Sequence, residues 1–377
     1  MDQRAGTERK RLKAQEEEHE ARQHFRELYS EARMKQLRKK HNSGELSMEE
    51  SMSLLMLGNI EHSEKIRDLG VSPQERHERI RSGNADYLVI ACSDARIPRL
   101  DSEDSPLIGL QIRIAGNVVP KPGTPSFEEM KDAVSNVKND GLIVVEGHCS
   151  CGACKERVKW MESGMKPTGS PELDSLLHEV FGTSPEDNAM AQITKAREKL
   201  ELGERASGAV VYDWENGGIR IVSDNSSPLM EILVDNWNHR HTEAFEEGGL
   251  SQRLSKHKPH AIAVGTGDLP FSLATILHSR QNEVFSTTGS DRGLDDLDKA
   301  SILYAVEHLG VRHIPFIAPG GPKDRKKIGQ MFDRWEEQLR AMSVHGKKVL
   351  ADLIDSGELK ISRLRYDLGN GELKDIG

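Results

Sequence analysis

The sequence predicts an α/β fold of two consecutive units, each with a mainly parallel sheet flanked by helices, behind a helical N-terminal arm. Short apolar runs rich in β-branched residues and bounded by turn formers are typical of buried parallel strands. The chain has such runs at 87–91 and 142–145, and similar runs recur in the same order at 261–264 and 314–317. A repeated order of elements indicates two copies of one fold.

The composition restricts the classes of function. The chain has 377 residues and a net charge of -9, without a basic concentration in the strand regions, which argues against a nucleic-acid partner. No apolar run approaches the roughly 18 residues of a membrane helix, so we expect no membrane insertion. The N-terminus is too charged for a signal peptide. We therefore expect a cytoplasmic protein.

Residues 1–80 are predicted to form the helical arm. Residues 1–40 are mostly Lys, Arg, Glu and Gln, and a narrow apolar stripe at helical spacing contains Phe25, Leu28, Tyr29, Met34 and Leu37. Ser47 and Glu50 resemble a capping box, which predicts a helix of some twenty residues ending near Gly70. A shorter helix is predicted over 73–81. The stripe either packs on this protein or binds another one, and the sequence leaves both open.

Residues 81–225 are predicted to form the first α/β unit. A helix is expected between the two strands, over 126–139, and further helices over 171–200. The runs at 208–213 and 219–222 flank a turn with two glycines, Gly217 and Gly218, which predicts a hairpin on the sheet edge.

Metal-ligand residues follow both strands of this unit. Cys92 comes directly after the first run, and His148 and Cys151 follow the second. Because the carboxyl ends of neighbouring parallel strands share one edge of a sheet, we expect the three side chains around one point. Two thiolates and one imidazole suit zinc and leave the fourth tetrahedral position open, as in catalytic sites.

Two other interpretations of these residues stay open. Cysteines clustered beside a histidine, without an export signal, favour a metal over a disulfide framework. A local structural zinc knuckle of His148, Cys149, Cys151 and Cys154 would leave Cys92 unexplained. The other alternative is a set of buried thiols with a core histidine.

Three motifs carry a resemblance to a known family. Cys92-x-Asp94-x-Arg96, then Arg-Ile-Ala-Gly-Asn at 113–117, then His148-x-x-Cys151-Gly together resemble the signature of the β-class carbonic anhydrases. The resemblance covers roughly residues 80–377. It implies zinc-dependent, reversible hydration of carbon dioxide to bicarbonate and a proton by hydroxide that zinc generates from water. The fold expected from it is two tandem β-carbonic-anhydrase-like units.

The resemblance also implies roles for individual residues. Asp94 and Arg96 would form a gate: Asp94 either occupies the fourth metal position or pairs with Arg96 and accepts a hydrogen bond from the reacting hydroxide. Gly116, Asn117 and Gly152 are assigned to the substrate pocket, where the first two supply a tight turn. No histidine besides His148 is placed near the zinc by sequence, so no proton shuttle is named.

The second unit, 226–377, is predicted to have lost the metal site. When its sequence is aligned with that of the first unit, Thr266 falls at the position of Cys92, Pro319 or Gly320 at that of His148, and Pro322 or Lys323 at that of Cys151. No cysteine follows Cys154, so we expect one zinc per chain. In the family the active unit is a pair of such folds, with each site near the interface between them. Here the degenerate copy would act as the partner and form one wall of the pocket.

Several alternatives remain at this point. Relatives with the same ligands hydrolyse carbonyl sulfide or carbon disulfide, and a zinc-stabilised scaffold is the alternative from a different class, although a scaffold needs no gate. Carboxysomal carbonic anhydrases share the plan of helical front, active half and silent half. This chain is shorter than they are and has the ordinary His-x-x-Cys spacing, so the carboxysome stays an alternative location. A homo-oligomer and a protein partner for the arm are also left open.

Overall fold

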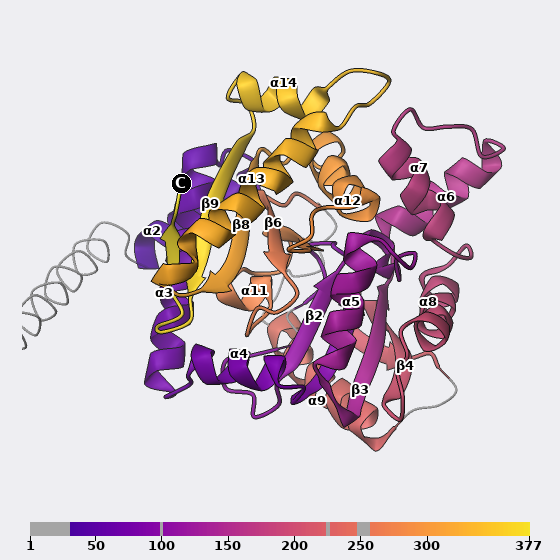
Figure 1. The fold of residues 1–377 in the computed structure, drawn as a ribbon, viewed down its shortest axis with the longest axis vertical. Coiled ribbons are helices and arrows are strands. Elements are labelled where there is room, and N and C mark those ends of the chain that lie inside the picture. The colour runs from indigo at the N-terminus through magenta and orange to yellow at the C-terminus, as the bar shows by residue number, and fades with distance from the viewer. Residues whose placement is uncertain (1–30, 99–100, 224–226, 247–256) are drawn as a thin grey trace, which may run out of the picture.

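The structure, a computed structural model, describes residues 31–98, 101–223, 227–246 and 257–377. The described residues form two α/β units, with three helices among residues 31–81 ahead of the first strand (Figure 1). These helices are α2 (Glu31–Ser43), α3 (Met48–Asp68) and α4 (Pro73–Arg81). The Ser47 hydroxyl accepts from the Glu50 amide at the start of α3, and the Glu50 carboxylate accepts from the Ser47 amide, both at 3.2 Å. The predicted capping box is thus confirmed.

The first sheet has the strand order β2-β1-β3-β4-β5, in which β5 alone is antiparallel to its neighbour. Its strands are β1 (Ala85–Ala91), β2 (Gly109–Arg113), β3 (Val137–His148), β4 (Ala206–Asp213) and β5 (Gly218–Ile221). All seven residues of β1 are buried, as expected of a strand covered on both faces. The predicted hairpin at the sheet edge is confirmed as β4 and β5.

Helices flank this sheet. They are η1 (Ala115–Asn117), α5 (Pro125–Ser135), α6 (Gly152–Glu162), α7 (Pro171–Glu179) and α8 (Pro185–Lys199). The predicted helix over 126–139 was too long at its C-terminal end. The chain turns at Asn136, whose carbonyl accepts from the Ala85 amide at 3.0 Å, and Val137 then pairs with Ala85 in the sheet.

The second sheet repeats the order of the first, as β7-β6-β8-β9-β10, again with only the last strand antiparallel. Its strands are β6 (Ala261–Thr266), β7 (Val284–Gly289), β8 (His313–Gly320), β9 (Lys360–Asp367) and β10 (Leu373–Asp375). The helices that precede or flank it are α9 (Pro228–Glu246), α11 (Leu273–Ile276), α12 (Asp296–Glu307), η2 (Pro322–Asp324), α13 (Arg325–Ala341) and α14 (Val349–Asp355).

One helix ahead of each unit, α3 or α9, packs on the other unit. Leu55 and Ile66 of α3 are buried in a cluster with strands of the second sheet, and Figure 1 shows α2 and α3 beside that sheet. Conversely, Leu233 and Trp237 of α9 are buried in the core of the first unit. Burying an aliphatic side chain contributes about 1.5–3 kcal/mol. The core of the first unit therefore includes residues after 225, and the cluster at the second sheet includes residues before 81.

Asn59 of α3 shows how closely the arm is bound. Its side chain is buried and donates to the carbonyls of Ile276 and Gly371 at 3.2 and 3.0 Å. Its Oδ1 accepts from the Leu373 amide at 2.7 Å. All three partners belong to the second unit, so the helix completes the hydrogen bonding of that unit as well as its core.

Part of the predicted apolar stripe can be placed. Met34 and Leu37 of α2 are buried against Leu54 and Leu57 of α3. Phe25, Leu28 and Tyr29 lie outside the described residues. No described helix has the length and apolarity to cross a bilayer.

The two units meet along β2 and β7. The Arg113 amide donates to the Thr288 hydroxyl at 2.9 Å, and the Thr287 hydroxyl donates to the Arg113 carbonyl at 3.0 Å. This seam brings the carboxyl ends of β1 and β3 next to the second unit.

Candidate metal centre

Cys92, His148 and Cys151 converge at the carboxyl ends of two neighbouring strands. Cys92 follows β1, His148 ends β3 and Cys151 precedes α6. Their ligand atoms all lie within 4.8 Å of one another, and the two sulfur atoms are 3.9 Å apart. All three residues are buried. The parallel pairing of β1 with β3 therefore produces the convergence that the strand ends predict.

The donor atoms of this group fit zinc. The Nδ1 atom of His148 lies 3.0 Å from the Cys149 carbonyl, which favours a proton on Nδ1 and a free lone pair on Nε2. Nε2 is buried and has no hydrogen-bond partner among the described residues. The neighbouring Cys151 thiol and burial raise the pKa of Cys92, and binding a divalent cation removes such thiol protons.

Asp94 and Arg96 form a bidentate pair beside the three ligands. Arg96 Nε donates to Asp94 Oδ1 at 3.0 Å, and its Nη2 donates to Oδ2 at 2.6 Å. Oδ2 also lies 3.8 Å from His148 Nε2, so the carboxylate is close to one of the three ligand atoms that would hold a metal. Burial opposes ionisation of Asp94, but the charges that His257, His148 and Arg96 carry in the acid range, where the carboxylate titrates, keep its pKa below the usual value.

His257 belongs to the second unit and was not found by sequence reasoning. Its Nε2 atom lies 3.2 Å from Asp94 Oδ1, and burial lowers its pKa to about 4. No local pattern marks it, because it stands among lysines and other histidines in the segment just before β6. Only the contact between the units brings it to the site.

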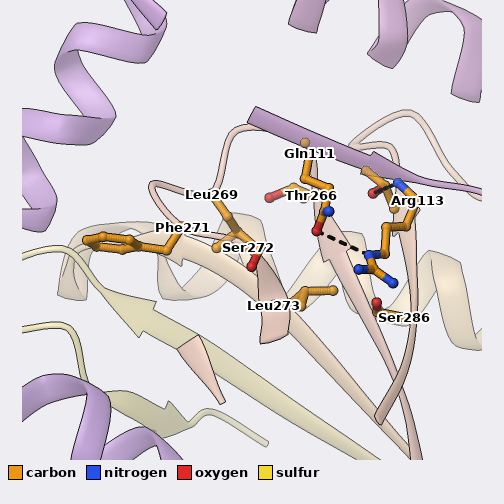
Figure 2. Close-up of a pocket in the computed structure, with 10 residues that line it drawn as sticks. Gln111, Arg113, Thr266, Leu269, Phe271, Ser272, Leu273 and Ser286 are labelled. Atoms are coloured by element: carbon orange, nitrogen blue, oxygen red, sulfur yellow. Dashed lines mark hydrogen bonds between the residues drawn. The ribbon is translucent and has the colours of Figure 1, made fainter. Parts of the chain in front are cut away.

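Arg113 holds the loop that carries Cys92 and Asp94. Its Nη1 donates to the carbonyls of Cys92 and Asp94 at 3.3 and 3.2 Å. Figure 2 shows Arg113 beside Gln111, whose Oε1 accepts from Arg113 Nε at 3.1 Å, in a small cavity between the units. The sequence motif included Arg113 without indicating this role.

Gly116 and Asn117 lie behind the metal ligands. Gly116 has a φ of 70°, which favours glycine, and its amide donates to the Cys92 sulfur at 3.2 Å. The Asn188 amide donates to the Gly116 carbonyl at 2.7 Å and to Asn117 Oδ1 at 3.3 Å. The two residues therefore support Cys92, and neither lines the pocket described next.

An apolar pocket opens beside Cys92 and Asp94, and both units line it. The first unit contributes Gly152 together with leucines of α7 such as Leu176. The second unit contributes Phe285 of β7 and Tyr304 of α12. A Cβ atom at Gly152 would lie 2.6 Å from the Tyr304 hydroxyl, so only glycine leaves room there.

The equivalent positions of the second sheet carry no ligand group. Pro319 pairs with Tyr366 in the same way as His148 pairs with Tyr212. Of the two candidates from the sequence, Pro319 and Gly320, the equivalent of His148 is therefore Pro319. Within the described parts of the chain, Cys92, His148 and Cys151 form the one group of three such ligands.

Cys149 and Cys154 are not members of that group. The Cys149 sulfur donates to Asp213 Oδ1 at 3.4 Å and accepts from the Trp214 amide at 3.3 Å, while Cys154 is buried on α6. The local zinc knuckle is therefore not formed by the residues that the structure describes.

The comparison with protein families identifies a part of the first unit. The family model described as carbonic anhydrase matches residues 87–211, less than half of the chain. That segment contains all three metal ligands, Asp94 and Arg96. A comparison with curated proteins gave no match.

Several solved structures are similar to part of the chain. One of the two tetrameric beta-carbonic anhydrases of the ascomycete Sordaria macrospora is 20% identical with a TM-score of 0.29, over 40% of this chain and 96% of that one. A Coccomyxa beta-carbonic anhydrase in complex with acetazolamide is 18% identical with a TM-score of 0.27, over 41% and 87%. The apo form of a carbon disulfide hydrolase is 19% identical with a TM-score of 0.29, over 41% and 87%. At these TM-scores the likenesses carry no conclusion about activity.

Proposed function

We propose that this protein catalyses the reversible hydration of carbon dioxide to bicarbonate and a proton, with zinc held by Cys92, His148 and Cys151. One observation carries the proposal. Three buried ligand atoms lie within 4.8 Å of one another, and a bidentate Asp94–Arg96 pair stands beside the unpartnered Nε2 of His148. A structural zinc site is closed by four protein ligands, whereas this group offers three.

The chain's own residues divide the remaining tasks. Zinc, when bound, supplies Lewis-acid activation of water near neutral pH. Asp94 is ionised and would orient a water molecule at the open side of the site, because its bidentate pairing with Arg96 holds the carboxylate in place beside the ligands. His257 is neutral at pH 7, since burial lowers its pKa to about 4, so it contacts Asp94 without adding a charge.

The apolar pocket suits the substrate better than the product. Carbon dioxide is small and has no net dipole, so side chains such as Leu176, Phe285 and Tyr304 can hold it without hydrogen bonds. Bicarbonate is an anion, and an apolar pocket disfavours a charge that lacks partners. The lining therefore favours entry of the gas and departure of the ion.

The second unit is proposed to act as a built-in partner for the first. Three features support this pseudo-dimer: the two sheets share one strand order, the helices α3 and α9 are exchanged, and Phe285 and Tyr304 complete the pocket. A location in the cytoplasm belongs to the same proposal and can be tested by fractionation of the source cells.

Stopped-flow hydration with a pH indicator tests the function. We expect carbon dioxide turnover by the purified protein with one zinc per chain, loss of turnover on chelation and recovery on adding zinc. Carbonyl sulfide and carbon disulfide are assayed in parallel, because the same ligand set serves all three gases in the alternative hypothesis. Turnover of a sulfur gas alone would reassign the substrate. Zinc-loaded protein inactive on all three gases would favour the scaffold.

A further inference from the structure

Gln281 belongs to the second unit, but its side chain contacts the first. Its Nε2 atom donates to the Arg96 carbonyl at 2.9 Å and to the Tyr212 hydroxyl at 2.8 Å. Arg96 lies in the loop after β1, whereas Tyr212 lies on β4, where it pairs with His148. One amide group therefore joins the second unit to two segments beside the metal site.

The loop from Cys92 to Arg96 is held through its carbonyl oxygens. Each of the five accepts a hydrogen bond: Cys92 and Asp94 from Arg113, Ser93 from the Ser286 amide, Ala95 from the Asn282 amide, and Arg96 from Gln281. The three bonds from Ser286, Asn282 and Gln281 come from the second unit. Gln281 supplies the only one of these three that comes from a side chain, and it acts on the residue that pairs with Asp94.

The position of the Arg96 side chain determines which positions the Asp94 carboxylate can adopt. The carboxylate is fixed by Arg96 Nε and Nη2, yet its Oδ2 is only 3.8 Å from His148 Nε2. A carboxylate released from Arg96 at that distance is able to reach the open metal position. Because a bidentate pair depends on the planar fork of the guanidinium, a shift of the Arg96 backbone weakens the restraint.

We propose that Gln281 is a positioning residue, through which the second unit keeps Arg96 paired with Asp94 and keeps the carboxylate away from the fourth metal position. This inference rests on the proposed zinc site. It makes the second unit part of the gate, in addition to its contribution to the pocket wall.

Gln281→Leu tests the proposal, because it removes the donor while keeping a side chain of similar size. The protein is loaded with cobalt in place of zinc and titrated with azide, which competes with Asp94 for the open position. We expect azide to bind about tenfold more weakly and kcat for carbon dioxide to fall by a similar factor, as losses of supporting contacts do in metal sites. The KM and a cobalt content of one per chain should stay unchanged.

Gln338→Leu is the matched control. Gln338 lies within the second unit, where its Oε1 accepts from the Leu294 amide at 2.8 Å, away from the first unit's loop. A folded Gln281→Leu protein with normal azide affinity and turnover would overturn the proposal, and so would an equal loss in Gln338→Leu. Gln281→Glu has the same size and cannot donate, so it replaces the leucine variant if that protein does not fold.

The readouts separate this inference from the proposed function. Wild-type protein that binds cobalt and azide without hydrating carbon dioxide would reject the function. The azide affinities of the two variants would still decide the role of Gln281.

Discussion

His257 of the second unit lies 3.2 Å, Nε2 to Oδ1, from Asp94 of the first. The neighbouring His148 Nε2 is 3.8 Å from the other oxygen of the same carboxylate. Asp94 is thus placed between an imidazole of each unit, and the second unit contributes a polar group to the proposed reaction as well as apolar walls.

His257→Ala should lower kcat about tenfold, which corresponds to about 1.4 kcal/mol of transition-state stabilisation. The reason is that Asp94 loses a neighbour that restricts its orientation, whereas the metal ligands keep theirs. Stopped-flow hydration together with zinc analysis measures both effects. His178→Ala, at an exposed position on α7, is the control. An unchanged kcat in His257→Ala would show that His257 does not contribute to the reaction.

Arg96→Ala should lower turnover about 100-fold, or about 2.7 kcal/mol. Asp94 then loses two hydrogen bonds, at 3.0 and 2.6 Å, and becomes free to approach the metal. Arg96→Lys keeps the charge without the planar fork, so it should recover only part of the activity. Initial rates at saturating carbon dioxide give the comparison, and full retention of turnover by Arg96→Ala would contradict the gate.

Cys92→Ser should abolish zinc binding and lower the melting temperature of the protein. Metal binding that is specific to the folded state stabilises that state, and without metal the site leaves His148 Nε2 buried and unpartnered. Cys149→Ser should retain one zinc per chain, because that thiol bonds Asp213 and the Trp214 amide instead. Metal analysis and thermal unfolding provide the test. Equal zinc loss in both variants would instead support the local knuckle.

Glu129→Gln should change how stability depends on pH. Glu129 of α5 accepts from the Gly267 amide at 2.8 Å, and burial and then Asp268 raise its pKa to about 7. The folded state therefore holds this proton more tightly than the unfolded state, so its contribution to stability falls as the pH rises from about 4.5 to about 7. The loss is on the order of 1–3 kcal/mol.

Urea unfolding at pH 5 and pH 8 measures this effect. The decrease in unfolding free energy between the two values should be smaller in Glu129→Gln than in the wild type. Glu128→Gln serves as the control, because the Glu128 side chain is 37% exposed. If the unfolding free energy depends on pH in the same way in wild type and Glu129→Gln, the pKa of Glu129 is not raised in the folded state.

Gly58→Ala should destabilise the protein by about 1–3 kcal/mol, the usual cost of overpacking. A Cβ atom at Gly58 of α3 would lie 1.9 Å from the Leu277 carbonyl oxygen of the second unit. Gly329→Ala is a matched change in α13, where the added Cβ meets nothing within 4 Å, and it should stabilise by about 0.5–1 kcal/mol through helix propensity. Melting temperatures that shift in the same direction in both variants would contradict the close packing of α3.

The sequence predicted the elements of the fold because their signals are local. The apolar run before Cys92 lies in β1, and the capping box of Ser47 and Glu50 lies at the start of α3. The three metal ligands were also accessible, since each stands at a strand end and parallel strands share an edge. The helix predicted over 126–139 was too long, because no side-chain pattern marks the turn at Asn136.

The sequence predicted that the second copy lines the pocket, but the individual residues that make the contacts between the units were beyond sequence reasoning. An apolar stripe on α3 indicates that one face is buried, but it does not indicate which sheet covers that face. His257 and Gln281 reach the site only because the units pack along β2 and β7, and their local sequences resemble ordinary polar segments. Residues whose roles depend on distant packing leave no periodic signal.

The exchange of α3 and α9 has a consequence for dissecting this chain. A fragment that ends near residue 225 would keep all its metal ligands but would lack Leu233 and Trp237, which fill its own interior. The complementary fragment would lack Leu55 and Ile66. Each piece made separately would expose an unfilled apolar surface, so the two should be recovered as a soluble pair only when they are coexpressed, in the manner of a split reporter.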